Sequence, residues 1–291
     1  MKTFGKTLFG MLAAALIAGG IFIAYSLYQN NRDVDMPQAG ELQSSLDRAV
    51  DWLHNNRQTI MQQHNPALWW MLKEASDIHP SPRLRDFYQQ YKTAYLDKQR
   101  RNIWTPYFIP GYRPYVPDIV ELDRLHPYQL FFIYALSCDA DLETEAVIRQ
   151  QFQADFCGMH FLQPRCTTHQ LMGVRLLQQR NCGQHEQLAA QLLDTIETEL
   201  TWDFRVTDSY LQRALMLAES GQYARIKPVW IQRILQAQMP DGGWSDFDPI
   251  IDIGRLSPGF TSTLPRIGAK PSDFHASAQG IWLMALLLQA Q

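Results

Sequence analysis

The sequence lacks an excess of charge of either sign. Its 291 residues include 26 lysines and arginines against 29 aspartates and glutamates, a formal net charge of −3, and contain no block of like charge. Proteins that bind nucleic acids usually present a basic face, so this composition argues against such a partner. Long β-type runs are also absent, whereas a hydrophobic content of 46% is enough for the large core of one domain.

The one long uncharged run lies near the N-terminus. Lys2 and Lys6 precede an uncharged stretch over residues 8–28, and the next charged residue is Arg32. A helical stretch of about 20 residues can cross a bilayer, and the basic flank would place its N-terminus in the cytoplasm. A cleaved signal peptide is the alternative, but this run is longer than a usual signal-peptide core and lacks a small-x-small cleavage pattern. We therefore expect a transmembrane helix that acts as an uncleaved anchor, over residues 1–28.

The rest of the chain divides into a linker and one domain. Residues 29–40 are polar with a single proline and are typical of a linker, and residues 41–291 form the predicted domain. Without the two N-terminal lysines, 24 basic residues remain against 29 acidic ones, so this part is mildly acidic. The charge pattern around the anchor predicts a single-pass protein of the cell inner membrane, with its domain in the periplasm or another extracytoplasmic space.

Apolar segments recur along this domain with a period of about 40 residues. Three of them begin at His126, Thr167 and Thr207, and looser copies begin at Asn65 and Phe274. Most open with a capping or helix-starting residue and then turn almost wholly apolar, which predicts buried helices. Amphipathic segments alternate with them, at residues 42–62, 82–98, 142–156, 185–200 and 225–238. The alternation predicts two concentric layers made of about five helix pairs.

One stretch within these repeats carries a family resemblance. In residues 236–244 an apolar helix runs into a glutamine, a turn and the sequence Gly-Gly-Trp. This stretch resembles the Gln-to-Trp repeat of the α/α-toroid superfamily, which includes terpenoid cyclases, protein prenyltransferases and some polysaccharide lyases. The resemblance covers roughly residues 42–291, and it implies an all-α fold, an α/α toroid of about five helix pairs.

The resemblance does not extend to the known catalytic motifs of these families. Class II terpenoid cyclases need an Asp-x-Asp-Asp acid, and Asp246-Phe-Asp248-Pro lacks the last carboxylate. Prenyltransferases and lanthionine cyclases use a zinc set with cysteine in the later repeats, but no cysteine follows Cys182. The catalytic arginine of toroid pectate lyases has no assignable counterpart, since Arg255 or Arg266 would be a guess. Fold resemblance alone does not fix the reaction.

The lengths of the loops predict where a binding site lies. Links from each buried helix to the next amphipathic helix are short. Three links from an amphipathic helix to the next buried helix are long, at residues 99–125, 157–166 and 245–273. All links of one kind lie on one face of a toroid, so the long loops are expected to gather over the N-termini of the buried helices. Helix N-termini favour anionic groups, so we expect a binding site at this mouth.

The four cysteines have two interpretations. Cys157-x-x-His160 followed by Cys166-x-x-His169 could bind zinc. An even cysteine count outside the cytoplasm instead favours disulfides. Cys138 and Cys182 end consecutive buried helices on the short-loop face, and Cys157 and Cys166 bracket one loop on the opposite face. We therefore predict the bridges Cys138–Cys182 and Cys157–Cys166, and we expect no metal and no cofactor.

The candidate catalytic residues are polar groups at the predicted mouth. They are His126, His169, His275, Asp208 and Tyr210. Imidazoles at equivalent repeat positions around one cavity could serve as general acid or base. The alternative is that each is a helix cap or a satisfied core group, and Asp208 in particular stands where an N-cap is expected.

The candidate ligand-binding residues are mostly aromatic. The loop over residues 99–125 interleaves aromatic residues with prolines, so it could be a stacking platform for sugar rings or could simply pack onto the end of the domain. Asp246 and Asp248 could bind calcium or act as a carboxylate pair, and a solvated turn is the alternative. The predicted ligand-binding residues are Trp104, Tyr107, Tyr112, Tyr115, Tyr128, Asp246 and Asp248.

Two functions remain open on this evidence. The first is a membrane-anchored, extracytoplasmic binding or scaffold module that holds a glycan, peptide or protein at its loop-bearing mouth, and it is favoured because no catalytic motif is complete. The alternative is a polysaccharide lyase or glycoside hydrolase acting on envelope or imported glycan. Convergence of His126, His169 and His275 in an open cleft lined by Trp104 or Tyr112 would favour the enzyme, and loops that fill the cavity would count against it.

Overall fold

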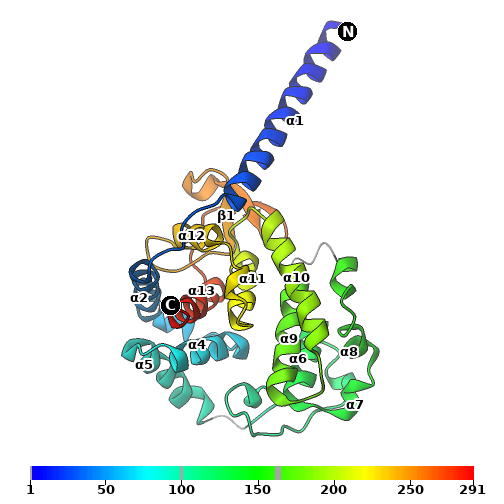
Figure 1. The fold of residues 1–291 in the computed structure, drawn as a ribbon, viewed down its shortest axis with the longest axis vertical. Coiled ribbons are helices and arrows are strands. Elements are labelled where there is room, and N and C mark those ends of the chain that lie inside the picture. The colour runs from blue at the N-terminus through cyan, green and yellow to red at the C-terminus, as the bar shows by residue number, and fades with distance from the viewer. Residues whose placement is uncertain (1, 99–100, 161–164) are drawn as a thin grey trace.

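Helices make up most of the protein in the computed structural model. The structure describes residues 2–98, 101–160 and 165–291, except for the side chains of residues 2–10, 12, 15, 159 and 160. Figure 1 shows the arrangement. The α-helices are α1 (Lys2–Asn31), α2 (Ala39–Asn55), α3 (Arg57–Ile60), α4 (Pro66–Ile78), α5 (Pro82–Tyr91), α6 (Pro127–Ser137), α7 (Ala140–Glu143), α8 (Ala146–Gln150), α9 (Cys166–Arg180), α10 (Glu186–Trp202), α11 (Asp208–Glu219), α12 (Pro228–Ala237) and α13 (Phe274–Gln289). Shorter elements are the π-helix η1 (Lys92–Leu96) and the 3-10 helices η2 (Thr105–Tyr107), η3 (Ile119–Glu121), η4 (Phe156–His160), η5 (Tyr223–Arg225) and η6 (Gly254–Leu256). The predicted all-α class is confirmed.

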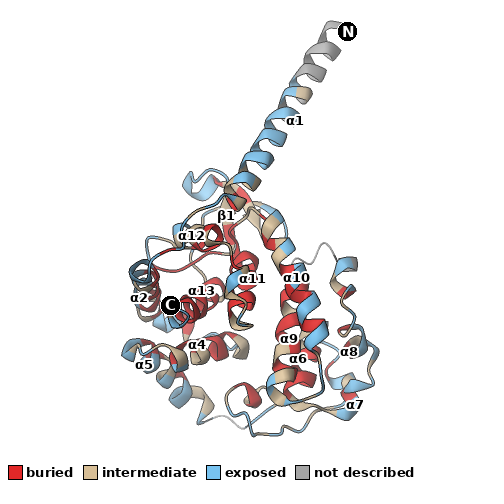
Figure 2. Cartoon of the chain, in the orientation of Figure 1, coloured by how far each residue is buried: buried red, intermediate tan, exposed pale blue. Residues whose placement is uncertain are grey.

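The five apolar repeats are the buried helices α4, α6, α9, α11 and α13. In α11 every residue from Asp208 to Ala218 is buried, and in α13 every residue from Ala276 to Leu287. Helix α13 packs against α4 and α11, α9 packs against α11 and α6, and both α4 and α6 contact η2. The helices α2, α5, α10 and α12 pack around this group with one face buried and one exposed (Figure 2). The predicted alternation of buried and amphipathic helices is therefore observed.

A small antiparallel sheet lies in the third long connection, where no strand was expected. Its strands are β1 (Phe247–Pro249), β2 (Pro258–Thr261) and β3 (Pro265–Ile267), in the order β1-β2-β3. Gly259 is required at its centre, because a Cβ there would lie 2.4 Å from the carbonyl oxygen of Asp248. Strands of three or four residues carry too little alternation to be read from the sequence.

The segment predicted as one amphipathic helix over residues 142–156 is broken in the structure. It contains α7, α8 and then turns. The buried side chain of Gln170 explains the break, because its amide donates to the carbonyl oxygens of Gln151 at 2.7 Å and Gln153 at 2.8 Å. These two bonds hold the chain in a non-helical path after α8.

Both predicted disulfides are present. Cys138 and Cys182, just beyond the ends of α6 and α9, are bridged with their Cα atoms 5.8 Å apart. Cys157 and Cys166 close the second long connection with a Cα separation of 5.5 Å. All four cysteines are thus paired, which leaves no thiolate in the Cys157 and Cys166 motifs for zinc. Such bridges persist in oxidising compartments outside the cytosol.

The Gln-to-Trp turn has a structural role. The amide of Gln238 donates to the carbonyl oxygen of Ser45 at 2.8 Å, which ties the end of α12 to α2. The indole of Trp244 is buried and donates to the carbonyl oxygen of Ile234 at 2.8 Å. Gly280 of α13 lies against this ring, where a Cβ would approach it to 2.5 Å. The turn therefore joins three helices.

Helix α1 projects away from the rest of the molecule (Figure 1). Its last turn is held by Asn30, whose amide donates to the carbonyl oxygen of Leu200 at 2.7 Å and accepts from the Tyr210 hydroxyl at 2.8 Å. Among the described residues, no helix combines the length and the apolar character needed to cross a membrane. The predicted span over residues 8–28 includes positions 8–10, 12 and 15, whose side chains lie outside the described part, so the anchor stays a prediction.

Candidate functional site

All five buried helices line one cavity of about 360 Å³. Each contributes at least one side chain to its wall: Met71 from α4, Phe132 from α6, Met172 from α9, Gln212 from α11 and His275 from α13. The volume lies in the range of small-molecule sites. The apolar repeats that build the core therefore also build the walls of a polar-lined cavity.

Two of the three long connections line this cavity, and the third contacts a residue behind its wall. Trp104 and Tyr107 from the first and Arg165 from the second line it directly. The third contributes Ser262, whose hydroxyl donates to the carboxylate of Asp208 behind the cavity wall. The expected gathering of the long loops beside the N-termini of the buried helices is thus observed for the described residues.

His275 and Asp208 form a hydrogen-bonded pair at the wall of the cavity. Asp208 Oδ2 lies 3.0 Å from His275 Nδ1 and 3.7 Å from Arg165 Nε, and the backbone N–H of Ser209 donates to Oδ1 at 2.8 Å. Burial, with only 2% of the side chain exposed, would raise the pKa of Asp208. The hydrogen bond with His275 and the charges of His275 and Arg165 outweigh burial and lower this pKa to about 2, so the carboxylate is ionised at neutral pH.

The second nitrogen of His275 faces an amide. Gln279 Nε2 lies 3.3 Å from His275 Nε2, and the Gln279 Oε1 atom has no hydrogen-bond partner within the described protein. With Nδ1–H donating to Asp208, Nε2 is the acceptor in the neutral ring. Rotation of the Gln279 amide would present its oxygen to a protonated Nε2, so this side chain is suited to both protonation states of His275.

His169 contributes a neutral imidazole to the same cavity. Its ring stacks on Tyr128 with centroids 4.3 Å apart. Burial lowers the pKa of His169 to about 3, and the nearby His275 and Arg165 add to the effect. At neutral pH this ring is therefore a hydrogen-bonding group and not a cation.

Two buried polar groups that line the cavity lack a partner among the described residues. Gln212 is 1% exposed, and its Oε1 atom accepts from the Thr168 hydroxyl at 2.9 Å while its Nε2 atom has no acceptor. The Tyr107 hydroxyl is likewise unpaired, although its side chain is almost fully buried. An unsatisfied buried polar group costs about 1–3 kcal/mol, so each of these groups needs a partner such as an ordered water or a ligand.

His126 lies beside the cavity without lining it. Its backbone N–H donates to the side chain of Gln129 at 2.9 Å, and its ring stacks on Tyr128 with centroids 5.6 Å apart. Two of the three predicted histidines, His169 and His275, therefore share the cavity, and Trp104 lies on its wall. Of the predicted aromatic residues, Tyr107 and Tyr128 also line it.

Three predicted site tyrosines lie elsewhere. The Tyr210 hydroxyl donates to Asn30 at the base of α1, so a catalytic role at the cavity is not supported. Tyr112 lies under the guanidinium of Arg101, 5.3 Å from its ring centroid, and the side chain of Tyr115 is 83% exposed. The described lining of the cavity contains neither Tyr112 nor Tyr115.

Asp246 and Asp248 are also placed away from the cavity. Asp248 accepts from the backbone N–H of Val206 at 2.8 Å, and burial raises its pKa. Asp246 lies 3.8 Å from Arg266. Within the described residues there is no group of three or more His, Cys, Asp or Glu side chains that could hold a metal ion. Both aspartates therefore organise the third long connection.

A second cavity of about 510 Å³ adjoins the first. Pro66 and Trp104 line both of them. The second cavity adds the cations Lys92 and Arg101 and an aromatic wall that includes Tyr91. Trp104 therefore lies between two hollows that both combine aromatic faces with basic groups.

Sequence reasoning missed four residues that shape the site: Arg165, Gln212, Ser262 and Gln279. For Gln279 a signal existed, because it is a single amide just before the apolar run over residues 280–288 of the predicted buried helix, whereas Gln212 stands beside Arg213 and is less conspicuous. A buried amide in such a stretch needs a specific partner, so it is informative. Arg165 and Ser262 reach the site through the course of two long loops, which no local pattern reveals.

Comparison of the chain with protein-family models, with curated proteins and with solved structures found no match.

Proposed function

We propose that the protein is an extracytoplasmic α/α-toroid module whose cavity binds a small anionic ligand with a sugar-like ring. The observation that carries the proposal is the composition of the cavity wall: its described residues include the cation Arg165 and no carboxylate. The unpaired amide of Gln212 adds a donor, and Trp104 and Tyr107 add flat apolar faces. Asp208 lies behind His275 and Arg165 and offsets part of the positive charge.

Two features support the toroid. The buried helices contact one another in the order α6, α9, α11, α13, α4, and η2 contacts both α4 and α6. The turn from Gln238 to Trp244 joins α12, α2 and α13, and this turn resembles the repeat turn of the α/α-toroid superfamily. A toroid places one cavity at the centre of its inner helices, in agreement with five helices lining one cavity.

Two further features support attachment to the outer face of the inner membrane. The two disulfides are typical of an oxidising compartment. Helix α1 exposes the apolar side chains of Leu16, Ile17 and Ile21 to its surroundings and follows a basic N-terminal flank. We infer that α1 attaches the domain to the membrane.

Ligand binding is tested by titration calorimetry with galacturonate and glucuronate oligosaccharides and with their neutral counterparts. We expect the acidic ligands to bind at least about tenfold more tightly than the neutral ones, which corresponds to about 1.4 kcal/mol. Arg165→Gln is expected to remove this preference. Arg149→Gln, which changes an exposed arginine of α8 outside the described cavity lining, is the matched control. Equal affinity for neutral and acidic ligands, or unchanged affinity in Arg165→Gln, would contradict the proposal.

The His275–Asp208 pair favours a second candidate, a polysaccharide lyase. In this scheme Arg165 and Gln212 hold the carboxylate of a uronate, and His275 Nε2 removes the proton on the adjacent ring carbon. The electron pair of that C–H bond forms a carbon–carbon double bond, the glycosidic C–O bond breaks, and the leaving oxygen takes up a proton. Glycoside hydrolysis normally needs two carboxyl groups at the bond, and the described cavity wall holds none.

The lyase is separated from the binding module by its product. A lyase releases an unsaturated sugar with a new ultraviolet absorbance, whereas a binding module returns the ligand unchanged. Asp208→Asn is expected to lower kcat at least about a hundredfold with little change in KM, because the neutral amide no longer orients and stabilises the His275 imidazolium. Ligand binding with no product at any pH would leave the binding module as the function.

A further inference from the structure

The third long connection exposes an unusual number of large apolar side chains. Six of them are between 45% and 71% exposed: Ile250, Ile251, Ile253, Leu256, Leu264 and Ile267. They lie on and around the small sheet. A contiguous exposed apolar surface on a soluble domain usually marks a contact with another molecule or with a membrane.

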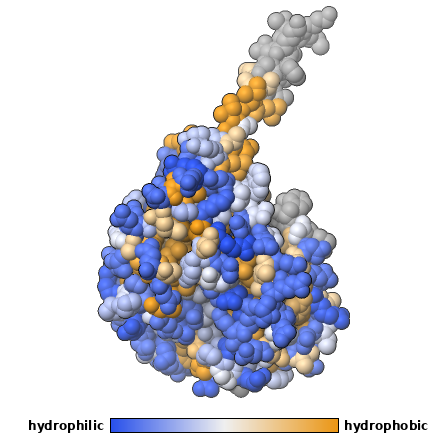
Figure 3. All heavy atoms as spheres, viewed as in Figure 1, coloured by the Kyte–Doolittle hydropathy of each residue, from blue (hydrophilic) through white to orange (hydrophobic). Residues whose placement is uncertain are grey.

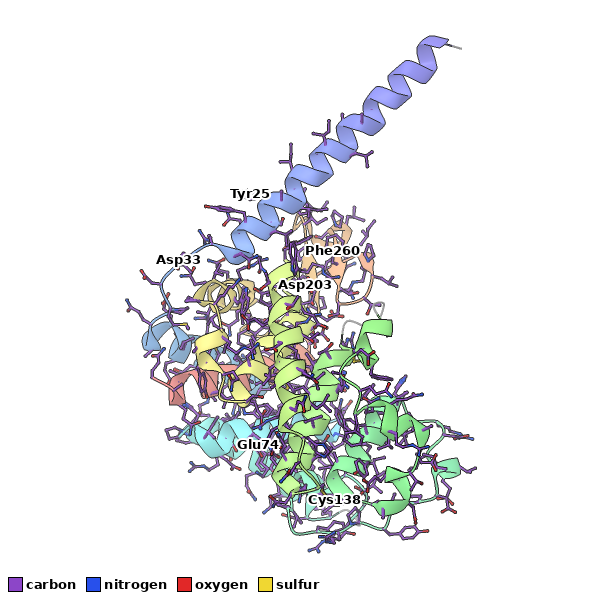
Figure 4. The ribbon with its side chains drawn as sticks, turned by 45° about the vertical axis from the view of Figure 1, so that its right-hand side comes forward. Tyr25, Asp33, Glu74, Cys138, Asp203 and Phe260 are labelled. Carbon is purple, nitrogen blue, oxygen red and sulfur yellow. A yellow bond between two sulfur atoms is a disulfide. The ribbon has the colours of Figure 1, made fainter. Side chains whose placement is uncertain are left out.

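This surface lies at the end of the domain from which α1 projects (Figure 1). Phe22 of α1 packs edge-on against Phe204 with ring centroids 5.9 Å apart, and Phe204 packs against Phe260 of β2 at 6.3 Å. Figure 4 shows Tyr25 and Phe260 near the same end of the body, and Figure 3 shows apolar residues along α1 and around its base. The apolar loop and the apolar helix therefore adjoin.

The distribution of apolar side chains around α1 identifies what covers it. Leu16, Ile17, Ile21, Ile23 and Tyr25 are all exposed. At about 100° per residue these positions span an arc of about 200°, and the exposed Met11 and Phe22 extend it over most of the circumference of the helix. A groove on a protein partner covers one face of a helix, whereas a lipid surface surrounds it on all sides. The occupant we commit to is therefore a bilayer.

The loop presents its apolar side chains from a fixed backbone. The buried hydroxyl of Ser257 accepts from the backbone N–H of Ile253 at 2.8 Å, and Ile250 N–H donates to the Pro258 carbonyl at 2.9 Å. Gly268 N–H donates to the Ser257 carbonyl at 3.0 Å. Exposed apolar side chains on a rigid tip enter a lipid surface without a large ordering cost.

Interfacial side chains flank the same end. Trp202, at the end of α10, is 68% exposed, and the neighbouring Leu200 carbonyl accepts from Asn30 of α1. Tyr28 of α1 is exposed as well, and the exposed Arg255 stands within the apolar loop. Tryptophan and tyrosine concentrate where a membrane meets water, and arginine binds anionic headgroups there.

We propose that the loop over residues 250–267 enters the lipid surface beside α1, so that the domain is held against the membrane at two points. This inference rests on the proposed attachment through α1. The loop gives the domain a second contact with the bilayer and so fixes its orientation, whereas α1 alone would provide a single contact.

The test uses the full chain with one reporter at the loop. All four native cysteines are paired, so the thiol introduced by Leu256→Cys is the only one that takes an environment-sensitive fluorophore. Val120→Cys is the control, because Val120 is 76% exposed and belongs to another long connection. Vesicles of phosphatidylcholine and phosphatidylglycerol carry lipid-attached quenchers. We expect a blue shift and at least about a twofold loss of emission at position 256, and no change at position 120.

The outcomes separate the loop from the helix. If the chain floats with vesicles while the label at position 256 stays water-like, the loop proposal is overturned and attachment through α1 stands. If the chain does not float at all, both proposals fail. Ile251→Ser combined with Ile253→Ser is expected to lower the fraction that floats about fivefold. A chain that sediments as a dimer without vesicles, with the label already shielded, would assign the loop to a second copy and overturn the proposal.

Discussion

Helix α11 carries two neighbouring polar side chains with opposite surroundings. Arg213 is 3% exposed, and its guanidinium reaches Asp203 and Glu199 at 2.7 Å each. Gln212, one residue earlier, is as deeply buried and lines the cavity, but its amide nitrogen has no partner among the described residues. Consecutive residues of a helix point about 100° apart, so the two side chains lie in different surroundings.

The difference between the two clusters shows which groups stabilise the fold and which are kept for a ligand. The Arg213 cluster is satisfied within the protein, since Asp203 also accepts from Arg205 at 2.7 Å. The cavity wall retains atoms on Gln212 and Tyr107 that have no partner among the described residues, as does Gln279 beside His275. A protein with only structural needs would gain stability by pairing or removing these groups. Their retention supports a binding role for the cavity.

The largest effect is expected from breaking the satisfied cluster. Arg213→Met retains much of the side-chain volume but leaves the buried carboxylate of Asp203 with one partner fewer. We expect a loss of about 3 kcal/mol of unfolding free energy, measured by urea denaturation of the full chain. Arg225→Met is the control, because Arg225 pairs with the more exposed Asp194 and Glu197 and should lose less than about 1 kcal/mol. Equal losses in the two variants would contradict the distinction.

A smaller effect is expected from the pH dependence of His169. The unfolded chain binds a proton at this residue below a pKa of about 6.5, whereas the folded chain does so only near pH 3. Protonation therefore favours the unfolded state, and stability falls as the pH drops from 6.5 towards 3. The ring is partly exposed to the cavity, so screening limits the loss between pH 7 and 4.5 to about 2 kcal/mol.

The matched variant for this pH dependence is His169→Phe, which keeps an aromatic ring against Tyr128. Denaturation curves at several pH values should show about 2 kcal/mol less loss in the variant than in the unmodified chain between pH 7 and 4.5. Asp208 does not obscure this window, because its stabilising contribution is lost only as the pH falls from its unfolded pKa of 3.8 towards its folded pKa of about 2. Identical slopes in both chains would show that His169 is protonated with equal ease in the folded state.

The smallest effect on stability is expected from Gln212→Leu. The change removes an amide whose nitrogen has no described partner, and the Thr168 hydroxyl, which loses the Gln212 oxygen, retains the Arg165 carbonyl oxygen as acceptor at 3.0 Å. We expect the unfolding free energy to change by less than about 1 kcal/mol, while affinity for an acidic oligosaccharide falls at least about fivefold in calorimetry. A large destabilisation with unchanged affinity would assign Gln212 to the fold.

Much of the architecture could be predicted because apolar residues recur along the sequence with a regular period. The apolar repeats predicted the buried helices, and the position of each cysteine relative to those helices predicted both disulfides. The strands at Phe247 and Pro258 were missed because contacts distant in sequence, and the close approach at Gly259, determine them. The break after α8 depends on Gln170, which acts from another helix.

The candidate site was predicted only in part, for a geometric reason. His169, His275 and Asp208 were chosen from equivalent repeat positions, and the structure brings them to one cavity or directly behind its wall. Tyr210 was chosen with Asp208, but two residues along a helix correspond to a rotation of about 200°, so its hydroxyl meets Asn30 on the opposite side. Arg165 depends on the path of a loop, and loop paths follow from tertiary packing.

The short bridge between Cys157 and Cys166 makes the structure of the cavity depend on when this disulfide forms in the cell. Arg165, the one cation among its described lining residues, directly precedes Cys166. In a reducing cytosol the bridge would be open, and this arginine would belong to a long connection without its disulfide constraint. We expect the pocket to reach its binding-competent form only after export, when the bridge forms. A chain retained in the cytosol would then fold its helices but not bind the proposed ligand.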